Sequence, residues 1–184
     1  MLTQDDDVVL LGPGGAPVGT ARRSAVHSDV TPLHLAYSCH VSDRAGRVLV
    51  TRRALDKIAW PGVWTNAFCG HPRPGESVVE AVRRGARHEL GVELLELRVL
   101  LPSFRYRATD ARGVVENELC PVYAATIESE PEPNPTEALE HAWLTPHDLA
   151  TAVGAAPFAF SPWLALQLDA LEQLRLAPQP AGRS

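Results

Sequence analysis

Short apolar runs separated by turn residues dominate the first fifty positions and predict strands rather than helices. Residues 8–11 are apolar and are followed at 12–15 by glycine and proline, which mark a turn. Residues 33–41 and 47–51 have the composition of strands, and the short segment 42–46 between them has the composition of a turn. The two runs therefore predict a β-hairpin.

The clearest helical pattern covers residues 77–90. Ser77 can cap the first turn, and Gly91 can end the helix. Apolar residues recur at helical spacing between these two positions, at Val78, Ala81, Val82 and Ala86. The segment is therefore predicted to be an amphipathic helix.

The remaining segments give more strands than helices. Residues 52–74 are rich in Trp, Pro, Gly and His; we expect an irregular segment, which inside a compact domain indicates function. The other expectations, in chain order, are strands over 94–101 and 114–127, a loop over 128–136, a strand over 141–144, helices over 146–153 and 162–176, and a frayed tail over 177–184. This order predicts an α/β (α+β) fold class, a mixed β-sheet flanked by helices.

Composition places the 184-residue chain among ordinary globular proteins, with 45% hydrophobic and 21% charged residues. We expect a single domain over residues 1–184, in which the glycines near position 14 would permit residues 1–26 to move. No run approaches the roughly 18 apolar residues of a membrane span. The acidic start MLTQDDD lacks the pattern of a secretory signal.

Net charge bears on the possible partners, and cysteine content bears on the cellular location. A net charge of −5 is unfavourable for general binding of nucleic acid, so we expect neither nucleic acid nor membrane as a partner. The three cysteines have no paired spacing, which predicts reduced thiols and a cytoplasmic location. Lys57 is the sole lysine among 17 basic residues; codon composition explains most of this bias, but a lone lysine also points mildly to a role that needs an ammonium group.

Histidine and glutamate residues from four places in the sequence form a candidate metal-binding set. Imidazole suits Zn, Mn or Fe, and carboxylates favour Mn or Mg. Two glutamates two positions apart on a strand share one face, so both carboxylates can point at one spot. The set is His27, His34, His71, Glu116 and Glu118. The alternative is that such residues are scattered on the surface, which is the interpretation we give to His40, His88, His141 and His147.

A loop-and-helix segment over residues 70–92 fits the skeleton of a Nudix box, in which acidic residues hold a divalent metal against a diphosphate. Gly85 and His88 stand where that box has glutamate, which argues against ordinary diphosphate hydrolysis. The alternative is a plain amphipathic helix with a polar face. The matching positions are Gly70, Glu76, Arg84, Glu89 and Gly91.

Cys69 is the cysteine that we expect to be reactive. It lies in the irregular segment beside His71, where a nearby metal or cation would lower the pKa of the thiol and make it an acid or a base. Cys39 and Cys120 are expected to be small buried residues.

Aromatic side chains are candidates for contact with a cation. Trp60 and Trp64 are expected to serve packing. Trp163 begins the last predicted helix, where its side chain can lean into a pocket, and Tyr106 is a further candidate.

Together these segments resemble type I isopentenyl-diphosphate isomerases, a family of the Nudix superfamily. The resemblance covers most of the chain from about His27 to Trp163 and is most specific in WPGVWTNAFCGHP and VENE; HLAYSCHV, LVTRRALDKIAWPGVWTNAFCGHPRPGES, FRYRATDARGVVENELCPVYAA and FAFSPW carry the rest. The isomerases share the departures from the box. The resemblance implies a Nudix fold and a flavin-independent enzyme of isoprenoid biosynthesis, which interconverts isopentenyl and dimethylallyl diphosphate.

The resemblance also implies two metal sites. One ion, Mn²⁺, Zn²⁺ or Mg²⁺, would bind the three histidines and two glutamates of the candidate set. A second, Mg²⁺, would join the substrate diphosphate to Glu89 and to the backbone carbonyl of Cys69. We expect a small-molecule substrate and a monomeric protein.

Catalytic and substrate-binding roles follow from the same resemblance. Cys69 on one face of the substrate and Glu118, with Tyr106 beside it, on the other would be the acid/base groups, and Trp163 would face a carbocation. Chemically, a carboxyl suits the acid and a soft thiol the base, because an alkene must be protonated before a neighbouring proton can leave. The residues implied to bind the diphosphate are Arg23, Arg53 and Lys57.

One residue that the resemblance implies for diphosphate binding is replaced by glycine in this chain. The helix arginine of the family corresponds to Gly85, and Arg84 or Arg87 could substitute for it. Two other functions stay as alternatives. A Nudix hydrolase of a nucleoside or prenyl diphosphate would release phosphate, whereas a metal-stabilised binding domain would not need Cys69 and Glu118 together.

Overall fold

The computed structural model describes residues 7–176. Helices and strands follow one another with short connections. In chain order they are β1 (Asp7–Leu11), β2 (Pro17–Arg22), α1 (Arg23–Val26), β3 (His34–Leu35), β4 (Tyr37–Ser42), β5 (Val48–Arg53), β6 (Trp64–Asn66), β7 (Phe68–Gly70), α2 (Val78–Leu90), β8 (Leu95–Leu101), β9 (Arg105–Thr109), β10 (Val115–Leu119), β11 (Val122–Thr126), β12 (Ala138–Leu144), α3 (Pro146–Ala155), the 3-10 turn η2 (Pro157–Ala159) and α4 (Pro162–Leu176).

The strands form two mixed sheets. One has the order β2-β1-β3-β10-β9, and the other has β12-β5-β4-β11-β8, with β6 paired to β5 and β7 paired to β4. In each sheet one parallel pair, β3 with β10 or β4 with β11, lies among antiparallel neighbours. The expected α+β class with mixed sheet and flanking helices is therefore confirmed.

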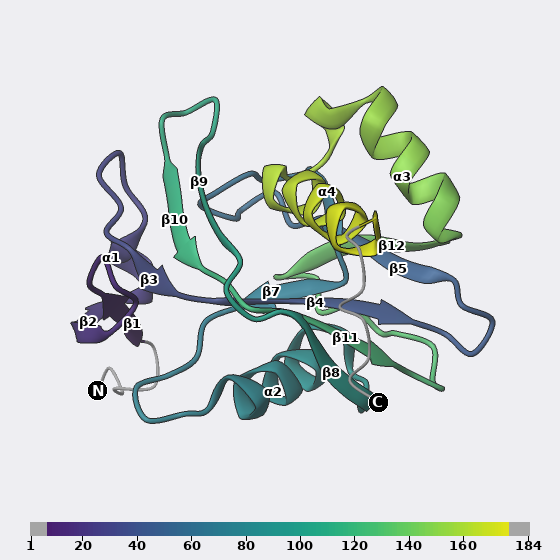
Figure 1. Cartoon of the computed structure of the whole chain (residues 1–184), viewed down its shortest axis with the longest axis horizontal. Coiled ribbons are helices and arrows are strands. Elements are labelled where there is room, and N and C mark those ends of the chain that lie inside the picture. Colours follow the sequence, from purple (N-terminus) through teal and green to yellow (C-terminus); the bar gives the residue numbers. More distant parts are fainter. Residues whose placement is uncertain (1–6, 177–184) are drawn as a thin grey trace, which may run out of the picture.

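Helices cover both faces of the larger sheet (Figure 1). The apolar stripe of α2 packs on one face, where Val82 and Leu90 lie in a buried cluster with Tyr37 and Phe68. Helices α3 and α4 lie on the opposite side, and Leu164 of α4 packs there against Val50 and its neighbours. The site described below lies where the two sheets meet.

Helix α2 begins and ends as the sequence predicts. Ser77 and Glu80 form a reciprocal capping box: the Ser77 side chain accepts from the Glu80 backbone N–H, and the Glu80 carboxylate accepts from that of Ser77. Gly91 closes the helix in the left-handed region, with φ of 67°. These two ends fix the register of the helix and hence the direction in which Glu89 points.

Three expectations about strands need correction. Residues 52–74 contain β6 and β7, which are too short, at three residues each, to show an alternating pattern. The predicted strand over 114–127 is divided at Pro121, which has no backbone N–H, so that β10 and β11 belong to different sheets. Strands β2 and β9 were not predicted, because most of their side chains are exposed and give no apolar period.

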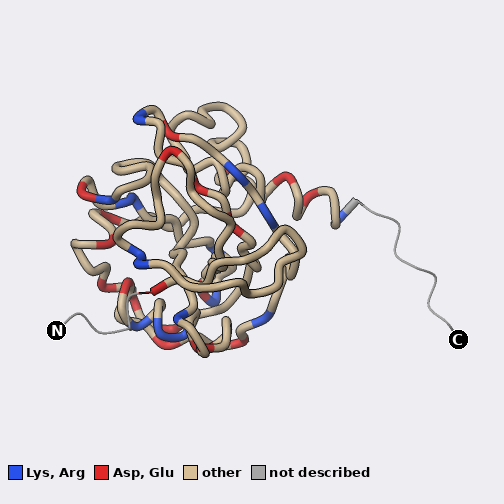
Figure 2. Tube along the Cα trace, turned by 90° about the vertical axis from the view of Figure 1, so that its left-hand side faces the viewer, with Lys and Arg blue, Asp and Glu red and all other residues tan. Residues whose placement is uncertain are grey.

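The first 26 residues include a β-hairpin, β1 with β2, whose register pairs Leu10 with His34 of β3. Residues 1–6 and the predicted frayed tail 177–184 lie outside the described residues. Within the described part, the search for a helix of sufficient length and apolarity to cross a membrane finds none. Figure 2 shows basic and acidic residues interspersed along the trace.

We predict that Ser77→Ala lowers the free energy of unfolding by about 1 kcal/mol, because the first turn of α2 loses its side-chain cap. Denaturant unfolding measures this difference. Ser103→Ala, in the exposed turn after β8, is the matched control and should change stability by less than about 0.5 kcal/mol. An equal loss in both variants would contradict the stabilising role of the cap.

Candidate active site

Three neighbouring strands place one polar side chain each in a row across the smaller sheet. Glu118 of β10 is paired with His34 of β3 on one side and with Tyr106 of β9 on the other. Glu116 lies two residues before Glu118 on the same strand and therefore on the same face. The pairing of β3, β9 and β10 thus builds half of the site from a short parallel contact and one hairpin.

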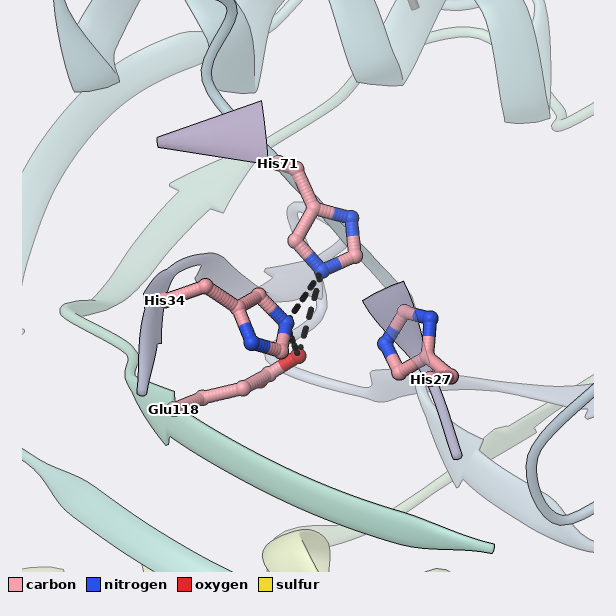
Figure 3. A group of neighbouring side chains, drawn as sticks. All are labelled: His27, His34, His71 and Glu118. Atoms are coloured by element: carbon pink, nitrogen blue, oxygen red, sulfur yellow. Dashed lines mark hydrogen bonds and ion pairs between the residues drawn. The ribbon is translucent and has the colours of Figure 1, made fainter. Parts of the chain in front are cut away.

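Two further histidines approach this row from other segments. His27 follows α1, and His71 follows β7 directly. One ligand atom from each of His27, His34, His71 and Glu118 lies within 4.8 Å of the others (Figure 3). The His34 and His71 Nε2 atoms are 3.2 Å apart, and Glu118 Oε1 is 3.4 Å and 3.2 Å from them. The predicted set is therefore brought together.

Hydrogen bonds orient two of these rings with Nε2 toward the centre. His34 Nδ1 lies 3.0 Å from the Pro32 carbonyl, to which it donates, and His27 donates to the Arg23 carbonyl. A neutral imidazole that donates through one nitrogen presents a lone pair at the other. Such outer hydrogen bonds are typical of metal-binding histidines, since they fix the tautomer that ligates.

Burial keeps two histidines neutral. It lowers the pKa of His27 and of His71 to about 4. Burial also opposes protonation of His34, but the adjacent Glu118 carboxylate more than offsets it and raises the pKa of His34. At His34 a proton and a metal ion therefore compete for the same nitrogen.

Glu116, the fifth predicted metal ligand, lies next to His27. Its Oε2 atom is 3.1 Å from His27 Nε2, and neither atom has a hydrogen-bond partner among the described residues. Burial, together with the charge of Glu118, holds the pKa of Glu116 well above its usual range. A histidine nitrogen and a carboxyl oxygen that face each other in this way can hold either a proton or a divalent cation between them, and the whole set of donors fits a divalent cation.

A cavity of about 340 Å³ lies beside this cluster and joins most of the predicted residues. Its walls also include Ser24, Ile58, Ala59, Gly70 and Glu137. The predicted site residues among its lining are Arg23, His27, Arg53, Lys57, Cys69, His71, Tyr106, Glu116, Glu118 and Trp163. His34 lies behind this wall, fully buried, and Glu89 lies on α2 outside the lining.

Cys69 and Glu118 line the same cavity. The Cys69 thiol is 3.2 Å from Ser38 Oγ and 3.3 Å from Asn66 Oδ1, and burial raises its pKa to about 12, which keeps it protonated at neutral pH. Tyr106 donates through its hydroxyl to Glu118 Oε2 over 3.0 Å. The cavity therefore offers a thiol and a carboxylate, both capable of proton transfer.

Aromatic rings close the cavity. Trp163 is 3% exposed, and its ring centroid lies 5.9 Å from Tyr106 and 5.6 Å from Trp60. Trp60 and Trp64 pack in buried clusters, as expected. Cys39 and Cys120, also as expected, are buried.

Asn66 is a residue of the site that sequence reasoning missed. Its Nδ2 donates to the carbonyls of Cys39 and Phe68, so its Oδ1 faces Cys69 and Trp163, accepting from the Trp163 indole over 3.2 Å. One buried amide thus positions both the thiol and the indole. The signal in the sequence was an amide side chain between two aromatic residues in WTNAF.

His40 is not a surface residue, contrary to the expectation. It is buried on β4, and its Nε2 donates to Gln167 Oε1 over 2.9 Å. Ser38 donates to the same oxygen over 3.2 Å and also contacts Cys69. The histidine therefore belongs to a polar network behind the thiol, formed because β4 and α4 pack together.

The three predicted basic residues line the cavity, and the charges of all three act on Glu89. Arg53 donates to the carbonyls of Ala59 and Trp60, and its guanidinium lies 5.1 Å from the centroid of the Trp163 ring. Lys57 is paired with Glu137, a carboxylate that sequence reasoning did not single out. Arg23 lies nearby in α1.

Neither of the two candidate helix arginines faces the cavity. Arg84 donates to both oxygens of Glu76 and to the carbonyl of His71, and Arg87 is paired with Glu93 at the surface. The contact that the family makes from position 85 is therefore not supplied by either neighbour. Arg84 instead ties the loop after β7 to α2.

The pKa of the Glu89 carboxyl on α2 is strongly shifted. Burial, followed by the nearby negative charge of Glu137, raises its pKa to about 8. A bound divalent cation favours the ionised form of such a carboxyl. This environment fits a residue that meets a cation and an anionic ligand at the same time.

The chain is similar to a known protein family and to named relatives. A family model described as NUDIX domain matches residues 32–164. The isopentenyl-diphosphate Delta-isomerase of Agromyces mediolanus is 62% identical over 164 residues, which cover 89% of this chain and 80% of that protein. The protein of the same name from Leifsonia xyli subsp. xyli is 57% identical over 180 residues, 97% of each chain.

Similar solved structures show the fold. A crystal structure from Deinococcus radiodurans has a TM-score of 0.71 at 23% identity, over 90% of this chain and 98% of that one. The MutT protein of Methanosarcina mazei Go1 has a TM-score of 0.63 at 15% identity, over 79% and 97%. Fold, site and sequence likeness lead to one conclusion: the chain belongs to the isopentenyl-diphosphate Delta-isomerase family and is built on the NUDIX domain.

Proposed function

We propose that this protein interconverts isopentenyl diphosphate and dimethylallyl diphosphate by moving one proton onto the carbon chain and one off it. The observation that carries the proposal is a single cavity that contains Cys69, Glu118 and a wall of aromatic rings. An isomerase of this kind needs two proton-transfer groups, a surface that tolerates a carbocation and a grip on a diphosphate.

The chemistry begins at the alkene, because an unactivated C–H bond beside it is too weakly acidic to lose a proton first. Glu118 shares a proton with the neighbouring Glu116, whose pKa lies well above its usual range. With the Tyr106 hydroxyl at 3.0 Å, Glu118 delivers this proton to the terminal alkene carbon, which leaves a tertiary carbocation. Cys69 then removes a proton from the carbon next to the cationic centre, and the new double bond forms. This step requires the thiolate of Cys69, which the Arg53 charge and a bound Mg²⁺ would favour by lowering the pKa of the thiol. The reverse reaction exchanges the two roles.

Trp163 stabilises the cation between the two proton transfers. Its ring face supplies negative electrostatic potential without a nucleophile that could trap the cation. The Oδ1 atom of Asn66 accepts one hydrogen bond from the Trp163 indole and one from the Cys69 thiol. These bonds fix the positions of the two groups relative to each other. The aromatic wall also limits water, which would otherwise attack the cation.

Three histidines and two glutamates would hold a divalent ion, Mn²⁺, Zn²⁺ or Mg²⁺, beside the proton-transfer carboxyl. Such an ion would neutralise the paired glutamates and orient Glu118. Glu89 and the Cys69 carbonyl would hold Mg²⁺ together with the substrate diphosphate. In the same cavity, Arg23, Arg53 and Lys57 bind the diphosphate and thereby orient the alkene.

The alternative of a Nudix hydrolase has less in its favour. Gly85 and His88 replace two glutamates of the box, and the thiol has no role in hydrolysis. We further propose that the chain works as one domain, as a monomer and in the cytoplasm, since its three cysteines are free thiols.

Proton NMR of the protein with Mg²⁺, Mn²⁺ and isopentenyl diphosphate in heavy water tests the proposal. We expect dimethylallyl diphosphate to appear with deuterium at the alkene-derived methyl carbon, because the added proton comes from exchangeable groups. Release of phosphate without a new alkene would instead establish hydrolysis. No reaction, with metal confirmed bound, would favour a binding domain.

Cys69→Ala is expected to lower turnover by roughly 10²- to 10⁴-fold, because one of the two proton-transfer groups is lost. Diphosphate binding should stay within about tenfold of the wild type, since the basic residues are unchanged. Steady-state kinetics and a competition assay with inorganic pyrophosphate measure the two effects. Cys39→Ala, at a buried cysteine of the core, is the control. Normal turnover of Cys69→Ala would contradict the role of the thiol.

Trp163→Leu is expected to lower turnover at least about tenfold, because a desolvated contact between a cation and an aromatic ring contributes about 2 kcal/mol or more. Trp163→Phe keeps a ring face and should recover part of the rate. Trp143→Leu, at an indole that contacts Arg47 outside the cavity, controls for a general effect of losing an indole. Equal rates for the Leu and Phe variants would show that the ring face is not used.

A further inference from the structure

Tyr37 presents a buried phenol beside the candidate active site, and no role has so far been given to it. The residue lies on β4, is 1% exposed, and packs edge-on against Phe68 with ring centroids 6.1 Å apart. Two glycines leave the space that its hydroxyl occupies. A Cβ atom on Gly70 would lie 2.5 Å from the hydroxyl oxygen, and one on Gly85 would lie 2.1 Å from it.

These short distances leave no room for a side chain at position 85. A Cβ atom there would collide with the Tyr37 hydroxyl, which belongs to a packed core residue. The glycine at position 85 and the phenol at position 37 therefore fit each other. The oxygen in this space comes from the sheet and not from the helix.

The Tyr37 hydroxyl lies near the segments that are proposed to bind Mg²⁺ and the diphosphate. Residues 85 and 89 are four apart on α2, so they lie one above the other, and helical side chains lean toward the N-terminus. The Glu89 side chain therefore extends over Gly85. Gly70 directly follows Cys69, whose carbonyl is the other proposed ligand. The hydroxyl thus lies between the two segments that carry the groups proposed to hold the metal.

Electrostatics agrees with this placement. Burial raises the pKa of Tyr37 well above its usual range; the Glu89 carboxylate raises it further, and the Arg84 guanidinium opposes it. The hydroxyl therefore keeps its proton and is a hydrogen-bond donor. No hydrogen bond is among the causes of this pKa shift, although buried phenols usually have a partner. A donor in this state is available to a ligand.

We propose that Tyr37 is a substrate-positioning residue, whose hydroxyl, housed by Gly70 and Gly85, donates a hydrogen bond to the Mg²⁺-bound diphosphate. The role rests on the proposed function, because it requires the diphosphate to bind at Glu89 and the Cys69 carbonyl. A neutral donor adds no charge at this point, where a box glutamate would repel the substrate's own negative charge. Tyr37 thereby favours holding the diphosphate over attacking it.

Tyr37→Phe removes the hydroxyl and keeps the ring that packs on Phe68. Isothermal titration with inorganic pyrophosphate in the presence of Mg²⁺ should show about tenfold weaker binding than the wild type, as expected for one hydrogen bond to a charged group. In steady-state kinetics, KM for isopentenyl diphosphate should rise by a larger factor than kcat falls. Tyr123→Phe, on the neighbouring strand β11, is the matched control and should change neither.

A pyrophosphate affinity of Tyr37→Phe within twofold of the wild type would overturn the role in binding. Failure of the proposed function has a different signature, since then the wild type itself would bind no Mg²⁺-pyrophosphate or would not isomerise the substrate. The two outcomes are therefore separate.

A double-mutant cycle tests the placement of the hydroxyl independently of the ligand. Gly85→Ala should lower the thermal unfolding midpoint of the wild type, because the new Cβ meets the Tyr37 oxygen. In the Tyr37→Phe background the same substitution should lower the midpoint by much less, since the nearest remaining ring atom would be 3.2 Å away. Equal shifts in both backgrounds would show that the hydroxyl does not occupy this space.

Discussion

The convergence of several electron-pair donors on one buried point is the constraint on which the structure depends. His27, His34, His71 and Glu118 bring three imidazoles and a carboxylate within 4.8 Å of one another, and Glu116 adds a second carboxylate through His27. Lone pairs that face each other in a buried site repel unless a proton or a cation lies between them. The cluster therefore fits a divalent cation, and the two sheets meet where that cation would bind.

Proton transfer depends on the same arrangement. The β10 strand that supplies Glu118 to the cluster also holds it against Tyr106 of β9, while β7 carries Cys69 to the other wall of the cavity. A buried amide, Asn66, then fixes the thiol and the Trp163 indole at once. The reactive side chains thus lie on strands and have little conformational freedom. This arrangement suits a reaction whose intermediate must be kept from water.

The likeness to MutT-type structures and the membership of an isomerase family are compatible, because fold and chemistry reside in different residues. The helix of the box keeps its structural features: the Ser77 cap, the Glu76–Arg84 pair and the terminal Gly91. What differs is the set of acidic residues on the helix, where Gly85 and His88 stand at glutamate positions of the box. A hydrolase needs its acidic residues to activate water, whereas an isomerase needs the diphosphate held intact.

The sequence by itself determined helix α2, because its cap, its apolar stripe and its terminal glycine are all local features. It also determined that Glu116 and Glu118 share one face of a strand, because they are two residues apart. The motif resemblance added the partners of those residues, and the structure brings them together. Long-range packing decided the rest. The burial of His40 against Gln167, the shared oxygen of Asn66, the pairing of Lys57 with Glu137 and the fit of Tyr37 between two glycines each join residues far apart in the chain. Such contacts leave no periodic signal in the sequence, because each depends on where separate strands and helices come to rest against one another.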